Sequence, residues 1–375
     1  MSKTNPSLHS QPLNIQIDAK IPMRDGTLLS GDIYSPTEGA PFPTILTRTI
    51  YDNSGAKNVE WANLFVQRGY AVVMVDCRGR HDSDGEWRPY VDEGQDGYDT
   101  QEWIGSQPWC DGGIGMFGGS YIGFTQSSTA PFASKYLKAP VPTVGQQDNY
   151  GHWYINGVLQ LHVPTTASVL WARAGGPEDK GSSVGRFGKY PPIEGSHRIT
   201  RNLPLVTAID EYFISPFIKD VMRHNTFDDF WKGYSMRFKY GEVETPALFV
   251  SGWYDNLVHE TFKLYKGWTT QGRTPEVRKL TKLLIGPWNH SDIGSSKPFG
   301  DISFGDEAEM DFPEEELRWY DRRLKGIDNG MDEELPIHYF VMGENVWRFG
   351  DQWPLSQTKY THYYLRSRGV ANSIN

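Results

Sequence analysis

The sequence has few cysteines, no excess of positive charge and no long apolar run. Two cysteines in 375 residues are too few for a disulfide-stabilised scaffold and suit a reducing cytoplasm. The net charge of −9 argues against a nucleic-acid-binding protein. Apolar runs fall short of the ~18 residues of a membrane-spanning helix, and the polar start lacks the pattern of a secretory signal. We therefore expect a cytoplasmic protein that binds neither membrane nor nucleic acid.

Motifs for metals, phosphates and dinucleotides are also missing. The sequence contains no His-Glu-x-x-His, no cysteine pairs at zinc spacing, no EF-hand loop, no phosphate loop and no dinucleotide fingerprint. The loop 76–85 (DCRGRHDSDG) superficially resembles a cation-binding loop, but we interpret it as a charged structural turn. We expect neither a metal nor another cofactor.

What the sequence does contain is the element order of an α/β fold with a mostly parallel sheet. Asp25-Gly26 predicts a tight turn between two strands within 14–36. The apolar run 70–76 (YAVVMVD) is typical of a central strand that is covered on both faces. Strands and helices then alternate, with strands predicted at 43–51, 70–76, 114–121, 245–255 and 282–290 and helices at 58–69, 92–107, 258–271 and 308–325.

Two regions interrupt this alternation. Residues 143–240 contain helical-looking segments at 153–161, 165–174 and 203–222, which we interpret as a helical lid over the sheet. After residue 330, the stretches 335–343, 346–354 and 361–366 resemble antiparallel strands. The predicted division is therefore a core of 1–142 and 241–330, a lid of 143–240 and a separate β segment of 331–375.

A turn with a serine follows one predicted strand. Residues 118–123 (GGSYIG) place Ser120 between strand 114–121 and a predicted helix. Small residues permit a sharp turn that exposes the serine hydroxyl at the carboxyl edge of a sheet. A strict G-x-S-x-G pattern would place glycine at 122, whereas this chain has Ile122 and then Gly123. We interpret Ser120 as a candidate nucleophile; the alternative is an incidental serine in a glycine-rich turn.

Two further residues complete a possible catalytic triad. A serine nucleophile needs a base, and the base needs an orienting carboxylate. Asp255 follows strand 245–255 and His290 follows strand 282–290, so both lie where the active sites of α/β proteins gather. On this fold the order is serine, acid, histidine, which excludes the histidines that precede Asp255. His259 lies on the following helix and is assigned a structural role.

An oxyanion intermediate would need two hydrogen-bond donors. The backbone N–H of Tyr121, which follows the nucleophile, is the first candidate. Tyr51, at the end of strand 43–51, could donate its phenol O–H. The alternative for Tyr51 is a core aromatic residue with its hydroxyl at the surface.

Several stretches together resemble the cocaine esterase group of α/β-hydrolases. They include PMRDGTLLSGDIY, RTIYDN, VDCRGRHDSDGEW, GGSYIGF, SGWYDN, IGPWNHS and FVMGENVWR, and the resemblance extends from about residue 14 to the end. The wider relatives are α-amino-acid ester hydrolases, glutaryl-cephalosporin acylases and X-Pro dipeptidyl-peptidases. The resemblance implies an α/β-hydrolase fold with an inserted lid and a C-terminal jelly-roll domain, of which this chain has only the start.

By the same resemblance, Ser120, Asp255 and His290 form the catalytic triad, and Tyr51 and Tyr121 form the oxyanion hole. The acyl pocket would include Trp153, Trp171 and Leu257. The family usually has proline where this chain has Ile50, so Tyr51 lacks that restraint on its loop. Amino-acyl ester hydrolases have carboxylates after the catalytic aspartate, whereas residues 256–258 (NLV) are uncharged. An acyl ester with an apolar or aromatic acid part fits this turn better.

These residues are compatible with three functions. The first is a serine hydrolase that cleaves carboxylic esters through an acyl-enzyme. The second uses the same nucleophile as an amidase, a β-lactam side-chain acylase or an acyltransferase. The third is a folded fragment without catalytic activity. A small-molecule ester is the expected partner, and a homo-oligomer is compatible with the sequence.

Overall fold

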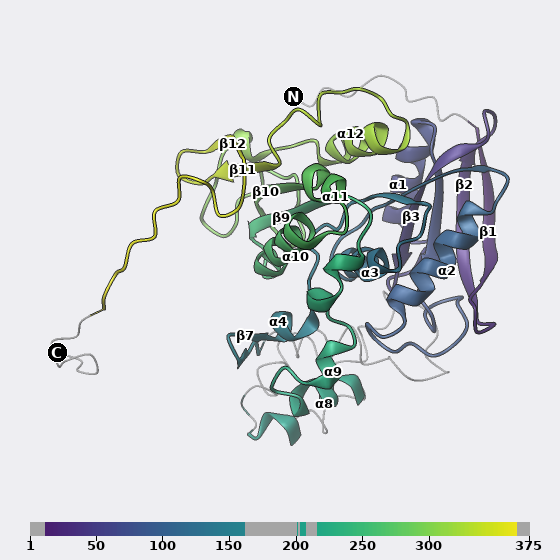
Figure 1. Cartoon of the computed structure of the whole chain (residues 1–375). Coiled ribbons are helices and arrows are strands. Elements are labelled where there is room, and N and C mark those ends of the chain that lie inside the picture. Colours follow the sequence, from purple (N-terminus) through teal and green to yellow (C-terminus); the bar gives the residue numbers. More distant parts are fainter. Residues whose placement is uncertain (1–11, 162–200, 202, 208–215, 366–375) are drawn as a thin grey trace.

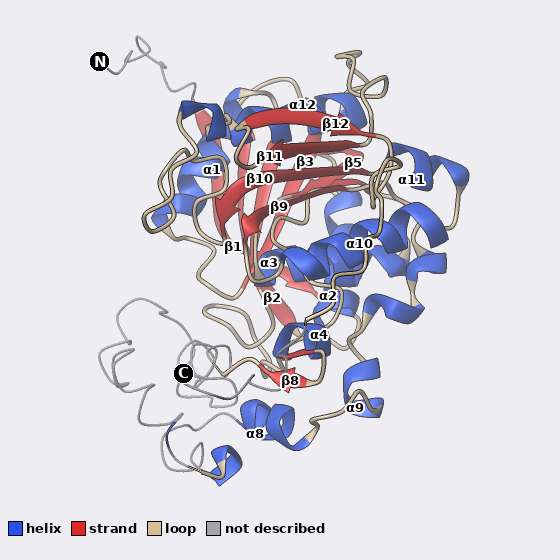
Figure 2. Ribbon diagram, turned by 90° about the vertical axis from the view of Figure 1, so that its left-hand side faces the viewer, coloured by secondary structure: helices blue, strands red, loops and turns tan. Residues whose placement is uncertain are grey.

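The computed structural model describes residues 12–161, 201, 203–207 and 216–365 (Figure 1). Apart from one short separate hairpin, the strands of the described residues form two hydrogen-bonded ladders, β1-β2-β4-β3-β5-β6 and β9-β10-β11-β12. Thr143 bridges Gly119 and Val250, so the ladders join into one layer (Figure 2). The strands of this layer are β1 (Leu13–Pro22), β2 (Leu28–Pro36), β3 (Phe42–Thr49), β4 (Ala71–Asp76), β5 (Cys110–Met116), β6 (Leu137–Pro140), β9 (Leu248–Tyr254), β10 (Lys282–Asn289), β11 (Ile337–Val341) and β12 (Val346–Gly350).

The centre of the sheet is parallel and its ends are antiparallel. The pairs β3–β4, β3–β5, β5–β6, β9–β10 and β10–β11 run parallel. The pairs β1–β2, β2–β4 and β11–β12 run antiparallel. Because parallel strands share one carboxyl edge, the residues that follow β3, β5, β9 and β10 gather there. The predicted mostly parallel α/β sheet is confirmed.

Helices cover both faces of the sheet (Figure 1). Alternate residues of β4 face opposite sides: Val73 and Val75 pack in one apolar cluster with α2, α10 and α11, and Val72 and Met74 pack in another with α1 and α12. This explains why the strand is apolar throughout. The helices of the two layers are α1 (Ala56–Gln67), α2 (Glu93–Gly105), α3 (Tyr121–Thr129), α10 (Val258–Gln271), α11 (Pro275–Leu280) and α12 (Phe312–Leu324). Among the described residues, no helix is long and apolar enough to cross a membrane.

The C-terminal hairpin differs from the sequence-based expectation. Residues 331–375 were expected to begin a separate β segment, but β11 pairs parallel with β10 and β12 pairs antiparallel with β11. The hairpin therefore extends the main sheet. Its pairing partner β10 lies about 50 residues earlier in the chain, which local patterning could not reveal. Residues 361–365 contain no strand, although 361–366 had been expected to form one.

The segment after residue 143 holds further short elements. Within the stretch 153–161, which was predicted to be helical, the structure has a β7 (Tyr154–Ile155) and β8 (Val158–Leu159) hairpin instead. Asn156 and Gly157 both have positive φ, so this Asn-Gly pair is a tight-turn signal that the helical interpretation overlooked. The prediction for 165–174 lies outside the described residues, and that for 203–222 lies partly outside. Among the described residues of this segment, the helices with defined bounds are α4 (Asn149–Trp153), α8 (Pro216–Arg223) and α9 (Asp229–Lys232), with 3₁₀ turns η4 (Met236–Phe238) and η5 (Tyr240–Glu242).

Candidate active site

Ser120 lies in a sharp turn between β5 and α3. Its backbone has φ 62° and ψ −124°, which is strained for a residue with a side chain, and such strain costs about 1–3 kcal/mol. β5 ends at Met116 rather than near 121, so residues 117–120 are free to form this turn. Ser120 is partly exposed, and the turn therefore presents a side chain at the carboxyl edge of the sheet.

The positions of the glycines in this turn follow from close contacts. A Cβ on Gly118 would lie 2.5 Å from Ile122 Cγ2, and one on Gly123 would lie 2.7 Å from the Thr143 carbonyl oxygen. At Gly123, helix α3 therefore lies close to the backbone of Thr143 and Gly145, which leaves no room for a side chain. This contact gives a reason for the glycine at 123, one position later than in the strict G-x-S-x-G pattern.

Asp255 and His290 follow the adjacent parallel strands β9 and β10. His290 Nδ1 lies 2.9 Å from Asp255 Oδ1. The same oxygen accepts the Leu257 N–H at 3.0 Å, and Asp255 Oδ2 accepts the Ser251 hydroxyl at 2.9 Å. The Asp255 side chain is fully buried and that of His290 is 36% exposed. A buried carboxylate held by two other donors thus orients an imidazole whose second nitrogen is available.

Tyr51 lies beside the serine turn. Burial raises the pKa of the Tyr51 hydroxyl, while the Ser120 hydroxyl and the Tyr121 backbone beside it act to lower that pKa. The structure thus brings Tyr51, Ser120 and the Tyr121 backbone together. Between Ser120 and His290, both of which it describes, there is no hydrogen bond; catalytic contacts of this kind often tighten only when substrate binds.

The side chain of Tyr121 points away from this group into a buried polar network. Its hydroxyl donates to Glu93 Oε1 at 2.8 Å and accepts the Tyr90 N–H at 2.9 Å. Arg48, fully buried in β3, pairs with Glu93 at 3.0 Å. Burial raises the pKa of Glu93, and the Arg48 guanidinium opposes that rise. The network anchors the start of α3, which follows the candidate nucleophile directly.

Sequence reasoning missed this network. In the helix that was predicted at 92–107, the charged residues Glu93 and Asp96 are buried. The available signal was Arg48, a charged residue inside an otherwise buried strand, because a buried cation requires a paired anion.

The structure describes two of the three predicted pocket residues. Trp153 is fully buried at the end of α4 and shares an apolar cluster with Tyr51 and Tyr121. Leu257, two residues after Asp255, is buried as well. Trp171 lies outside the described residues.

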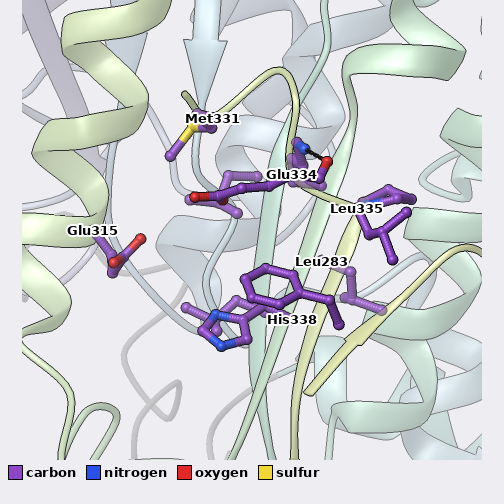
Figure 3. A pocket seen from close by; sticks show the side chains of 11 residues that line it. Leu283, Glu315, Met331, Glu334, Leu335 and His338 are labelled. Carbon is purple, nitrogen blue, oxygen red and sulfur yellow. Dashed lines mark hydrogen bonds between the residues drawn. The ribbon is translucent and has the colours of Figure 1, made fainter. Parts of the chain in front are cut away.

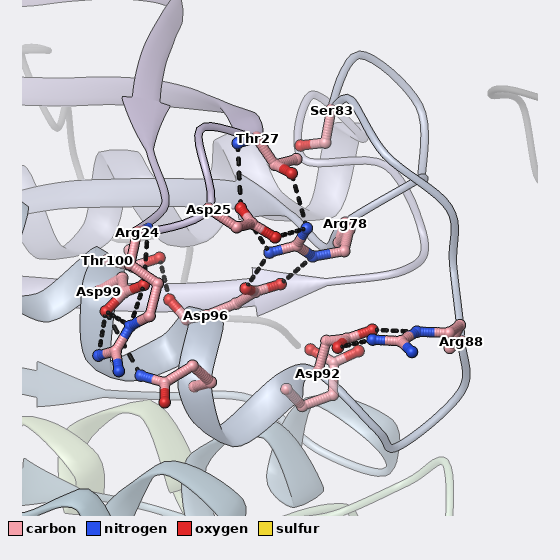
Figure 4. Close-up of polar contacts among 12 residues, drawn as sticks. Arg24, Asp25, Thr27, Arg78, Ser83, Arg88, Asp92, Asp96, Asp99 and Thr100 are labelled. Carbon is pink, nitrogen blue, oxygen red and sulfur yellow. Dashed lines mark hydrogen bonds and ion pairs between the residues drawn. The ribbon is translucent and has the colours of Figure 1, made fainter.

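Ion pairs of Arg78 connect the loop 76–85 to the β1–β2 turn and to helix α2. Arg78 contacts Asp25 at 2.7 Å and Asp96 at 2.6 Å (Figure 4). Neighbouring pairs join Arg24 to Asp99 and Arg88 to Asp92. Within the described ranges, no three histidine, cysteine, aspartate or glutamate side chains are grouped to hold a metal ion.

A separate small pocket lies at the opposite, amino end of β9, β10 and β11 (Figure 3). Its lining includes His338, whose ring stacks on Phe349 with centroids 4.3 Å apart. Burial lowers the pKa of His338 to about 4. The lining includes none of the candidate catalytic residues, so we assign this pocket no part in the chemistry.

The chain is similar to several known proteins. Residues 25–292 match the X-Pro dipeptidyl-peptidase (S15) family. The chain is 32% identical to the cocaine esterase of a Rhodococcus species over 96% of this chain and 64% of that protein. Two solved structures have a similar fold. An aminopeptidase from a Thaumarchaeota archaeon has a TM-score of 0.70 and 25% identity, over 95% of this chain and 61% of the other. An α-amino-acid ester hydrolase has a TM-score of 0.68 and 24% identity, over 94% of this chain and 62% of the other.

These similarities confirm the α/β-hydrolase fold and the predicted resemblance to cocaine esterase. The chain spans less than two thirds of the length of each of these relatives.

Proposed function

Because the chain belongs to the X-Pro dipeptidyl-peptidase (S15) family, we propose that it is a serine hydrolase that cleaves carboxylic esters through an acyl-enzyme. The observation that supports this most strongly is the 2.9 Å contact between His290 Nδ1 and Asp255 Oδ1. It lies at the sheet edge that also presents Ser120 on a strained turn. The 32% sequence identity to a cocaine esterase and the similarity in fold to an α-amino-acid ester hydrolase support the same chemistry.

In the proposed mechanism, His290 Nε2 takes the Ser120 proton as Oγ attacks the ester carbonyl carbon. The tetrahedral intermediate collapses when His290 returns that proton to the leaving alcohol. Water then attacks the acyl-enzyme, with His290 again removing and returning a proton, and releases the acid. Asp255 keeps Nδ1 protonated and stabilises the imidazolium that forms in each step.

Two donors would stabilise the oxyanion. They are the Tyr51 hydroxyl and the Tyr121 N–H, and the loss of one such donor typically lowers kcat about 10²- to 10³-fold. Burial favours the protonated, donating form of Tyr51, since it raises the pKa of the hydroxyl. We therefore assign Tyr51 the role of donor and not of base.

The substrate class follows from the charges near Asp255. The next residues, Asn256, Leu257 and Val258, are uncharged. Two buried carboxylates lie nearby, but Asp148 is paired with Arg237 at 2.6 Å and Glu260 with Lys263 at 2.5 Å. An α-ammonium group would find no unpaired carboxylate among them and would be costly to bury. We therefore propose an uncharged acyl group, bound between the core and a lid formed by 143–240, with Trp153, Trp171 and Leu257 in the pocket.

Labelling with a fluorophosphonate, followed by peptide mapping, tests the nucleophile. We expect one adduct, on Ser120, and none in Ser120→Ala or His290→Ala. Asp292→Asn, which changes a partly exposed carboxylate two residues after His290, is the matched control and should label normally. Folded protein that forms no adduct would overturn the proposal and favour a non-catalytic role.

Substrate assays then separate the remaining possibilities. Matched p-nitrophenyl esters and p-nitroanilides with acetyl, hexanoyl and phenylacetyl groups compare ester with amide cleavage, and added alcohols detect acyl transfer. We expect the esters to be cleaved at least tenfold faster than the amides. Adding an α-amino group to the phenylacetyl ester should lower kcat/KM, and a higher value would contradict the assignment of an uncharged acyl group.

A further inference from the structure

Tyr51 lies on a short loop between β3 and α1 that local backbone contacts hold only in part. Its own N–H donates to Thr49 Oγ1 at 2.9 Å. The next residue, Asp52, has φ 90°, a conformation that residues with side chains rarely adopt. A loop in this conformation needs support from elsewhere in the fold to keep the Tyr51 hydroxyl beside Ser120.

That support comes from the turn after β4. The carbonyl oxygen of Ile50, which precedes Tyr51, lies 3.3 Å from Arg80 Nε and 3.2 Å from His81 Nε2. Both side chains are buried, with Arg80 5% and His81 7% exposed. Burial and the adjacent Arg80 charge lower the pKa of His81, so the ring is neutral at neutral pH. Nε2 must then carry the proton to donate to this carbonyl.

The turn itself is held firmly. Arg80 N–H donates to the Cys77 carbonyl at 2.9 Å, and Ser83 N–H donates to the Arg80 carbonyl at 2.9 Å. The Ser83 hydroxyl donates to the Asp76 carbonyl at 2.7 Å. The Arg80 guanidinium also lies over the Trp87 ring, 4.6 Å from its centroid. Because these contacts fix the turn, the Arg80 and His81 side chains can hold the Ile50 carbonyl, and with it the adjacent Tyr51, in one position.

A second contact holds the other side of the Tyr51 loop. Asp76 Oδ1, at the end of β4, accepts the Asn53 N–H at 2.9 Å. Residues 50 and 53 are thus both fixed by the segment 76–81, and Tyr51 lies between them. In addition, the Arg80 charge lies close enough to act on the Tyr51 hydroxyl and to favour negative charge there.

We propose that His81 and Arg80 are positioning residues that hold Tyr51 in the oxyanion hole through the Ile50 carbonyl. This inference rests on the proposed function, because it concerns the donor that stabilises the oxyanion. The loop 76–85, interpreted from the sequence as a structural turn, thereby acquires a functional part. Neither residue is assigned a contact with substrate.

A double-mutant cycle tests whether these residues act through Tyr51. His81→Ala should lower kcat on a p-nitrophenyl ester about tenfold with KM changed less than twofold. The same substitution in a Tyr51→Phe background should change kcat less than twofold, because the donor that His81 positions is already absent. A purely structural role would instead give the same loss in both backgrounds, which would overturn the proposal.

Further variants keep the test valid if His81→Ala folds poorly. His81→Asn retains an N–H donor and should recover part of the lost kcat, and Arg80→Lys retains the charge but not the planar donor. His338→Ala, at the opposite end of the sheet, is the control for general destabilisation and should stay within twofold of the wild type. Full activity in folded His81→Ala and Arg80→Lys would overturn the proposal.

Fluorophosphonate labelling separates this result from a failure of the proposed function. If the wild type labels at Ser120 but the cycle is additive, only the positioning role is wrong. If the folded wild type neither labels nor cleaves esters, the proposed function fails and the positioning role fails with it.

Discussion

Replacing Asp255 by asparagine tests the most specific feature of the site. Asp255 Oδ1 accepts both the Leu257 N–H at 3.0 Å and His290 Nδ1 at 2.9 Å, whereas Oδ2 faces the Ser251 hydroxyl. The Leu257 N–H requires an acceptor, so the asparagine oxygen should occupy the Oδ1 position. The new amide group would then face Ser251, whose hydroxyl can rotate to accept. The His290 tautomer would be kept and only the negative charge lost.

The size of the loss follows from Coulomb's law. Two unit charges about 4 Å apart interact by about 4 kcal/mol at an effective dielectric constant of ~20. Each ~1.4 kcal/mol of barrier is a factor of ten in rate, so the full term corresponds to about a thousandfold. Because the His290 side chain is 36% exposed, solvent weakens the interaction. We therefore expect kcat to fall about 10²- to 10³-fold.

Steady-state hydrolysis of a p-nitrophenyl ester measures this change, with a thermal melt to confirm folding. Asp292→Asn removes a similar charge beside the same turn and should change kcat less than threefold. A folded Asp255→Asn variant within tenfold of the wild type would refute the assignment of Asp255. A loss well above a thousandfold would show that the His290 tautomer is not kept.

Three further predictions concern stability. Ser120→Gly should be more stable in urea unfolding than Ser120→Ala by about 1 kcal/mol, because φ is 62° at this position; equal stabilities would contradict strain in the turn. Burial raises the pKa of Glu316 to about 8, above its unfolded value, so the folded state loses stability as pH rises from about 4.5 to about 8. Relative to Glu316→Gln, the wild type should therefore lose on the order of 4 kcal/mol between about pH 5 and pH 9, and parallel pH–stability curves would exclude this. Asp148→Asn leaves Arg237, whose side chain is 34% exposed, without its buried partner and should lower the free energy of unfolding by about 2 kcal/mol. Asp148 also accepts the Gly151 N–H of α4, the helix that ends at Trp153, so KM should rise more than kcat falls. An unchanged melting temperature and an unchanged KM would count against this role.

Local sequence patterns determined the fold class and the candidate triad. The apolar run of β4 and the alternation of strands with helices predicted the parallel sheet. In such a sheet, residues that follow successive strands must meet at one edge. Ser120, Asp255 and His290 could therefore be proposed from their positions after β5, β9 and β10 alone. The glycines around Ser120 indicated the turn because side chains there would clash with neighbouring backbone and side-chain atoms.

The tertiary structure decided the contacts between segments that are distant in the chain. Arg48 and its partner Glu93 are 45 residues apart. The Asp148 backbone N–H donates to Glu260 Oε2, 112 residues later in the chain. No periodicity within a helix or strand encodes such a pair. The hairpin of β11 and β12 likewise joined the main sheet because β10 offered it an open edge, whereas its own pattern only indicated strands. The contacts of Arg80 and His81 with the Ile50 carbonyl oxygen also join distant segments. Every residue type has a backbone carbonyl, so the sequence does not indicate which one a buried donor will contact, and only the packing decides it.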